Sequence, residues 1–190
     1  MPRLSNRPTS LAVACDQRVT GSLVYSNLTI RTAGDSGLTP ETAARRLASL
    51  YFSELPCTSA GLFAAGTRRD SRGEHLALYF RLAPFLPFVI LGSPGEKWAP
   101  PQASVSYPIT GGLLASRPPA GALVFAAANR DDGSLVLAVR VDGYASRLAG
   151  DCTSLWRRTL YSGTQWFVHR MLVSRFLKVA ARRMSSPGQA

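Results

Sequence analysis

The chain has 190 residues, 46% of them hydrophobic, and a net charge of +11. This length and apolar content exclude a disordered chain and are sufficient for a folded domain with a buried core. No apolar run approaches the roughly 18 residues that a membrane-spanning helix needs, so we expect no such helix. Most of the basic residues are arginines, a bias that codon usage alone can produce, so the charge does not by itself identify a partner.

The first predicted elements follow a flexible arm over residues 1–18. Residues 22–31 alternate apolar and polar side chains, which predicts a strand. The succession Thr39, Pro40 and Glu41 predicts the start of a helix, because a hydroxyl caps the first turn, proline fits the first helical position and a carboxylate faces the positive end of the dipole. We expect Pro56 to bound this helix.

A series of antiparallel strands is expected next. Short alternating or apolar runs predict strands within residues 61–67, 75–82, 103–114, 122–128 and 134–141, and residues 85–91 form either a further strand or an apolar loop. The last two runs form a hairpin around a turn at residues 129–133. Residues 92–102 are rich in proline and glycine and are expected to form a loop.

A long C-terminal helix is predicted over residues 154–184, because apolar residues recur there with a helical period. Basic residues occupy its other side, and no acidic residue follows Asp151. This basic face is either simply solvated or turned toward an anionic surface or partner. Residues 185–190 are expected to be a flexible tail, which leaves one domain over residues 19–184.

The order of these elements predicts an α+β domain in which a curved antiparallel sheet of about six to seven strands packs on the long C-terminal helix. This order resembles the helix-grip fold of the START-like superfamily, which includes polyketide aromatases and cyclases and lipid carriers. The resemblance covers most of the chain. It implies an apolar space between sheet and helix, with a hydrophobic small molecule or lipid as the partner.

Three polar residues interrupt the apolar stripe of the long helix. Ser162, Gln165 and His169 share a face with Leu172 and Phe176. Burying such groups costs free energy unless each finds a partner, so this face either contacts a polar network in the core or lines a pocket. If this face lines a pocket, we expect His169 to act as general acid or base and Gln165 as an orienting group. The ligand would then contact Ser162, Leu172 and Phe176.

A second group of candidates lies on the strand predicted over residues 75–82. His75, Tyr79 and Arg81 share one of its faces. If that face looks inward, Tyr79 and Arg81 can polarise a carbonyl group opposite His169, and His75 can contact the ligand. If it looks outward, all three are surface residues. Tyr107 is a further candidate for ligand binding, with a place in the core as the alternative.

No pattern in the sequence indicates a cofactor or a metal. Cys15, Cys57 and Cys152 are far apart and have no spacing typical of a zinc site or a disulfide framework. The sequence contains no phosphate-cradling loop and no dinucleotide fingerprint. We therefore expect a cytoplasmic protein with no cofactor and no metal site.

The leading functional hypothesis is a protein that binds a hydrophobic ligand, or a cofactor-independent cyclase, dehydratase or isomerase, with its pocket between sheet and C-terminal helix. The alternative is a module that docks on an anionic membrane through the basic face of that helix, with Arg170, Arg175 and Lys178. Nucleic acid is not expected as a partner, because aromatic and basic residues are not interleaved along an element. The sequence indicates no oligomeric state.

Overall fold

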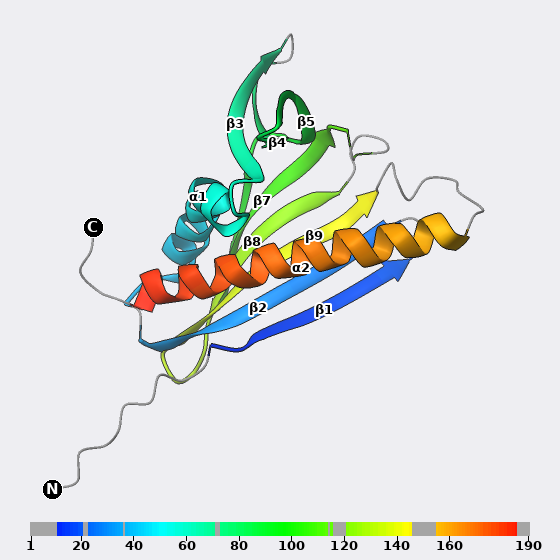
Figure 1. Cartoon of the computed structure of the whole chain (residues 1–190). Coiled ribbons are helices and arrows are strands. Elements are labelled where there is room, and N and C mark those ends of the chain that lie inside the picture. Colours follow the sequence, from blue (N-terminus) through cyan, green and yellow to red (C-terminus); the bar gives the residue numbers. More distant parts are fainter. Residues whose placement is uncertain are drawn as a thin grey trace, which may run out of the picture.

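A computed structural model describes residues 11–20, 23–35, 37–70, 73–113, 115, 121–145 and 155–185; within them, the side chains of 19, 20, 33–35, 70, 145 and 155–168 are not described. This part of the chain forms nine strands and two helices (Figure 1). The helices are α1 (Pro40–Thr58) and α2 (Leu155–Ser185). The strands are β1 (Val13–Thr20), β2 (Leu23–Asp35), β3 (Phe63–Asp70), β4 (Gly73–Phe80), β5 (Ala83–Leu91), β6 (Gly95–Ala99), β7 (Gln102–Gly111), β8 (Ala122–Asn129) and β9 (Ser134–Ala145).

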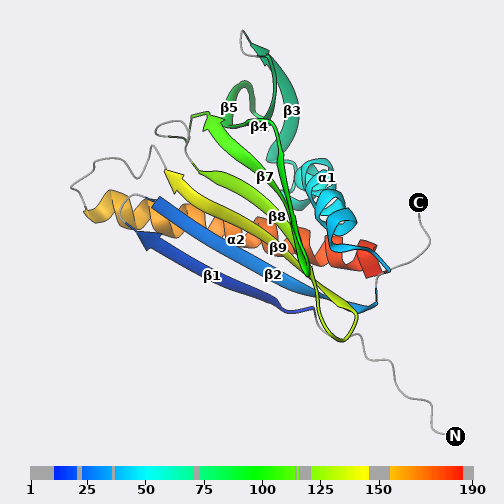
Figure 2. The ribbon, with the colours of Figure 1, turned by 180° about the vertical axis from the view of Figure 1, so that it is seen from behind.

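All nine strands belong to one antiparallel sheet, in the order β1-β2-β9-β8-β7-β5-β4-β3. The short strand β6 and the strand β5 share one edge of β7. β6 pairs with the first half of β7, and β5 pairs with its last residues. Both helices lie on the same face of the sheet, here called the inner face, and Figure 2 shows the other side of the sheet without a described helix. The strands β3, β4 and β5 project beyond the helices and are called the wing (Figure 1).

The core lies where α1 and α2 meet the inner face. Residues directly opposite each other on antiparallel strands share a face, so the row Leu28, Val139 and Phe125 points inward as a unit. These side chains are completely buried. Tyr51 of α1 joins the layers, because its ring lies 5.1 Å from that of Phe125. The ring of Phe176 in α2 is also 5.1 Å from that of Tyr51, in an edge-to-face arrangement.

The expected α+β architecture and the long C-terminal helix are confirmed, but the sheet has nine strands instead of six or seven. The proposed arm over residues 1–18 is wrong in its second half, because β1 pairs along its whole length with β2. Residues 1–10 and the tail from 186 lie outside the described residues. None of the described helices is long and apolar enough to span a bilayer.

The assignment of residues 92–102 to a loop is also wrong. Residues Gly95–Ala99 form β6, and two contacts with α1 hold this strand in place. Arg45 donates two hydrogen bonds to the carboxylate of Glu96, and its guanidinium group lies 4.8 Å from the centre of the Trp98 ring. Local composition did not reveal these long-range contacts.

The start of α1 is confirmed and its expected end is not. The side-chain oxygen of Thr39 accepts a hydrogen bond from the backbone N–H of Thr42 at 3.3 Å, and proline occupies the first turn. The helix continues past Pro56 to Thr58. A proline so close to the C-terminus removes only one backbone hydrogen bond, so the last turn can still form.

The cap predicts opposite effects of two alanine substitutions in α1. Thr39→Ala removes the acceptor for an N-terminal N–H group and should lower the free energy of unfolding by about 1 kcal/mol. Ser49→Ala, at an exposed position within the same helix, should leave it unchanged or raise it by up to about 0.5 kcal/mol. Urea denaturation of both variants measures the difference. Equal stability of the two variants would show that the cap contributes nothing.

Candidate functional site

His169 of α2 reaches the inner face of the sheet at β2. Its Nε2 atom lies 3.1 Å from Oγ of Ser26, across 143 positions of sequence. Ser26 is only 7% exposed and lies two residues before the buried Leu28, on the same face of β2. The tautomer of the imidazole decides whether His169 or Ser26 donates in this hydrogen bond.

Ser26 belongs to a row of side chains that crosses five strands of the inner face. It is directly opposite Gln17 of β1 on one side and Val141 of β9 on the other. The row continues through Leu123 of β8 to Tyr107 of β7. Three of these strands contribute apolar or aromatic residues, so the polar groups gather at the end of the row under α2.

Gln17 contributes a second polar group to this place. Its Oε1 atom is buried and has no hydrogen-bond partner among the described residues. A buried oxygen without a partner costs free energy comparable to a lost hydrogen bond. Gln17 and Ser26 are directly opposite each other, so this acceptor lies beside the pair of Ser26 and His169.

The row of Ser26 is less completely buried than the adjacent row. In the adjacent row, Leu28, Val139 and Phe125 are completely inaccessible to solvent. In the row of Ser26, by contrast, Gln17 and Val141 are only partly buried. The backbone of α2 continues beyond His169 to Leu155, along β1 and β2 (Figure 1). Val141 is therefore more accessible than Val139, the residue of the same strand in the adjacent row.

Burial makes His169 a neutral group at physiological pH. Desolvation lowers the pKa of His169 from the ordinary 6.5 to about 4, because the charged imidazolium loses its hydration. A neutral imidazole provides one donor and one acceptor of hydrogen bonds and little affinity for protons. The arrangement is therefore suited to recognising polar groups of an uncharged molecule. Within the described residues, no three His, Cys, Asp or Glu side chains are close enough to hold a metal ion.

Other predicted ligand contacts fall partly in this region. Tyr107 lies at the far end of the row, where its ring stacks edge-on against Phe52 at 5.2 Å, and burial raises the pKa of its hydroxyl. Leu172 is partly buried. Phe176 packs fully within the core against Tyr51, so its surface is occupied by protein. Ser162 and Gln165 fall in the part of α2 whose side chains lie outside the described residues.

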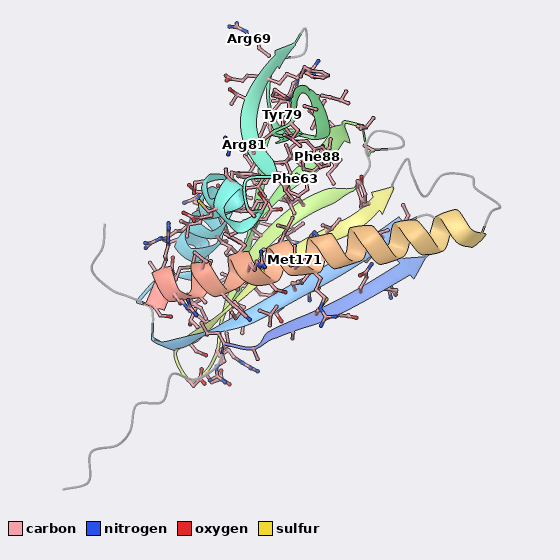
Figure 3. The ribbon with its side chains drawn as sticks, viewed as in Figure 1. Phe63, Arg69, Tyr79, Arg81, Phe88 and Met171 are labelled. Carbon is pink, nitrogen blue, oxygen red and sulfur yellow. The ribbon has the colours of Figure 1, made fainter. Side chains whose placement is uncertain are left out.

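The structure does not bring Tyr79 and Arg81 to His169. Both come from the wing, and four strands separate β4 from β2 in the sheet. Figure 3 shows Tyr79 and Arg81 on the wing, apart from Met171 on α2. Tyr79 packs beside Gly66 of β3, and Arg81 is exposed in the turn after β4. His75 is partly buried in β4, opposite Arg68 of β3.

The sequence carries a signal for Ser26. Val24, Ser26, Leu28 and Ile30 occupy one face of β2, so Ser26 is a polar interruption of an apolar face, as His169 is in α2. Gln17 interrupts Leu11, Val13 and Cys15 in the same way. Its segment was assigned to a flexible arm, so its face had no meaning until the pairing with β2 was known.

No protein-family model and no curated protein matches the sequence. Among solved structures, Zhui aromatase/cyclase from Streptomyces sp. R1128 has a TM-score of 0.51 at 13% identity, over 88% of this chain and 99% of that chain. Ms6760 from Mycobacterium smegmatis has a TM-score of 0.40 at 9% identity, over 94% and 100%. CalU16 from Micromonospora echinospora has a TM-score of 0.37 at 10% identity, over 97% and 81%.

The fold is helix-grip-like. The likeness to the aromatase/cyclase extends over nearly all of both chains, and at 13% identity it concerns the fold alone. The expected resemblance to the helix-grip architecture is therefore confirmed at the level of the backbone. Function has to be argued from the side chains on the inner face.

The lowered pKa of His169 predicts a loss of stability in acid. The folded-state pKa of about 4 lies below the unfolded value of 6.5, so the unfolded chain takes up the proton first as the pH falls. The contribution is fully present above pH 6.5, is lost as the pH falls to 4, and amounts to roughly 3 kcal/mol. His169→Gln cannot titrate and should lack this part of the pH dependence. Urea unfolding of the wild type and of His169→Gln across this pH range measures the difference. Superimposable pH profiles of the two proteins would contradict the lowered pKa.

Proposed function

We propose that the chain binds a hydrophobic small molecule on the inner face of the sheet, from His169 outward beneath the first half of α2. The observation that carries this proposal is the hydrogen-bonded pair of His169 and Ser26, with the unpartnered oxygen of Gln17 beside it. These polar groups lie beside Val141, which is only partly buried. Ligand sites in proteins combine a mainly apolar lining with a few converging polar groups, which is the composition of this region.

The polar groups define the kind of molecule that fits. The Oε1 atom of Gln17 accepts hydrogen bonds, so the ligand should bring a hydroxyl or N–H group to this position. A neutral His169 offers no charge to a carboxylate or phosphate. The apolar side chains of Val141 and Leu123 in the same row favour a hydrophobic body. We therefore expect an uncharged, largely apolar molecule with one or two hydroxyl groups.

A cofactor-independent cyclase, dehydratase or isomerase is the second candidate. The similar fold of an aromatase/cyclase and the pairing of an imidazole with a hydroxyl group favour it. A base works best when its pKa is near the operating pH, and with a pKa of about 4 His169 binds protons weakly at neutral pH. Catalysis would require the bound substrate to raise that value, so we rank binding first.

Filling the inner face should block the ligand. Val141→Phe adds volume to the row of Ser26, whereas Val136→Phe adds the same volume to the outer face of the same strand. We expect Val141→Phe to weaken binding of the apolar fluorescent probe N-phenyl-1-naphthylamine by at least about tenfold and Val136→Phe to leave it unchanged. Equal probe affinities in titrations of the two variants would place the site elsewhere.

Native mass spectrometry of the protein from its own host tests the same site with the natural ligand. The wild type should retain an apolar compound that Val141→Phe loses. His169→Gln then separates the two candidates, because glutamine preserves a hydrogen-bonding group but cannot exchange protons at neutral pH. Retention of the same compound by this variant, identical in mass and in chromatographic retention time to that from the wild type, supports binding, whereas an isomer of equal mass but different retention time supports isomerisation. Accumulation of a precursor heavier by one water, absent from the wild type, supports dehydration.

A further inference from the structure

The turn between β4 and β5 carries an exposed apolar patch, called the turn patch. Leu82 is 91% exposed and Phe85 is 80% exposed, which is unusual for side chains of this size. The patch consists of Leu62, Phe80, Leu82, Phe85, Leu86 and Leu113. Backbone hydrogen bonds join its segments, from Arg81 N to Leu62 O and from Leu113 N to Pro87 O, both at 3.0 Å.

An aromatic cluster supports the turn patch from below. The rings of Phe63, Phe80 and Phe88 lie 4.9 to 5.1 Å from one another and join the first strand of the wing to its last. Figure 3 shows Phe63 and Phe88 at the base of the wing, near Arg81. The exposed side chains are therefore presented on packed strands, and their exposure is a property of the fold.

The charge around the turn patch is positive. Arg81 is exposed within the patch, and the sequence from 75 to 95 contains no acidic residue. Arg68 and Arg69 are exposed farther along β3, toward the tip of the wing, where Glu74 of β4 lies directly opposite Arg69 (Figure 3). An apolar surface with an exposed arginine beside it is complementary to a partner that is both apolar and anionic.

A second copy of the chain fits this surface poorly. In a two-fold dimer the same patch meets itself, which would bring two Arg81 side chains together without an acidic residue of this segment between them. Leu82 in the turn and Phe85 in the irregular start of β5 are highly exposed, and such side chains enter a soft medium more readily than they form a flat interface. Pro84 and Pro87 have no backbone N–H group, which lowers the cost of moving the turn out of water.

We propose that the turn patch inserts into an anionic membrane, with Leu82 and Phe85 reaching the boundary of the acyl chains and Arg81 contacting lipid phosphates. The wing that carries the patch is separated from β2, the strand of Ser26, by β9, β8 and β7. The proposal therefore stands or falls independently of the pocket at His169. It also differs from docking through the basic outer face of α2.

Co-sedimentation with vesicles tests the insertion directly. The wild type should bind vesicles in which a third of the phosphatidylcholine is replaced by phosphatidylserine, more tightly than vesicles of phosphatidylcholine alone. The double variant Leu82→Ser/Phe85→Ser should bind at least about tenfold more weakly, because it loses two inserted apolar side chains. Arg81→Gln should bind about fivefold more weakly, and only to the vesicles that contain phosphatidylserine.

A matched variant on α2 identifies the docking face. Arg175 and Lys178 are exposed on α2, and Arg175→Gln/Lys178→Gln should bind phosphatidylserine vesicles nearly as well as the wild type. Loss of binding in this variant, with binding retained by Leu82→Ser/Phe85→Ser, would overturn the proposal in favour of α2. A wild type that ignores both vesicles would also overturn it. A dimer in analytical ultracentrifugation that the double serine variant dissociates would then identify a second copy as the occupant.

Discussion

The packing of α1 and α2 on the sheet around Tyr51 determines which part of the inner face is covered by both helices. The ring of Tyr51, which belongs to α1, contacts Phe125 of β8 and Phe176 of α2 at the same distance. This one side chain therefore links α1 both to the sheet and to α2. Burial raises the pKa of Tyr51 to about 12, which keeps its hydroxyl neutral throughout the physiological range. Because α1 covers only part of the sheet, the C-terminal half of α2 is enclosed and the remainder extends over β1 and β2 without it (Figure 1).

His169 lies at the boundary that this arrangement creates. Toward the C-terminus the next inward residues of α2, Val173 and Leu177, are completely buried. His169 itself is polar and meets Ser26, and Val141 opposite Ser26 is only partly buried. Desolvation lowers the pKa of His169, so the imidazole stays neutral at physiological pH.

The helices and most strands could be predicted because their patterns are local. A helical period over thirty residues and a cap at Thr39 are read from neighbouring positions, and both were found in the structure. The partner of His169 was not predicted, because Ser26 is 143 positions away and only the strand order brings it near. The strand that carries Tyr79 was predicted correctly, with Arg81 in the turn that follows it. Nothing in the local sequence shows that four other strands separate β4 from β2. Sequence periodicity gives the face of a residue, whereas the place of its strand in the sheet depends on distant pairing.

The short strand β6 also covers a strand edge that could otherwise pair with another chain. β5 pairs with only the far half of one edge of β7, so the backbone groups of the near half would otherwise be open to another chain. β6 covers that half with five exposed residues, including Glu96 and Lys97. Short, charged edge strands discourage the edge-to-edge pairing that leads to aggregation. The ion pair of Arg45 and Glu96 therefore has a protective consequence, since it fastens to α1 the strand that closes this edge.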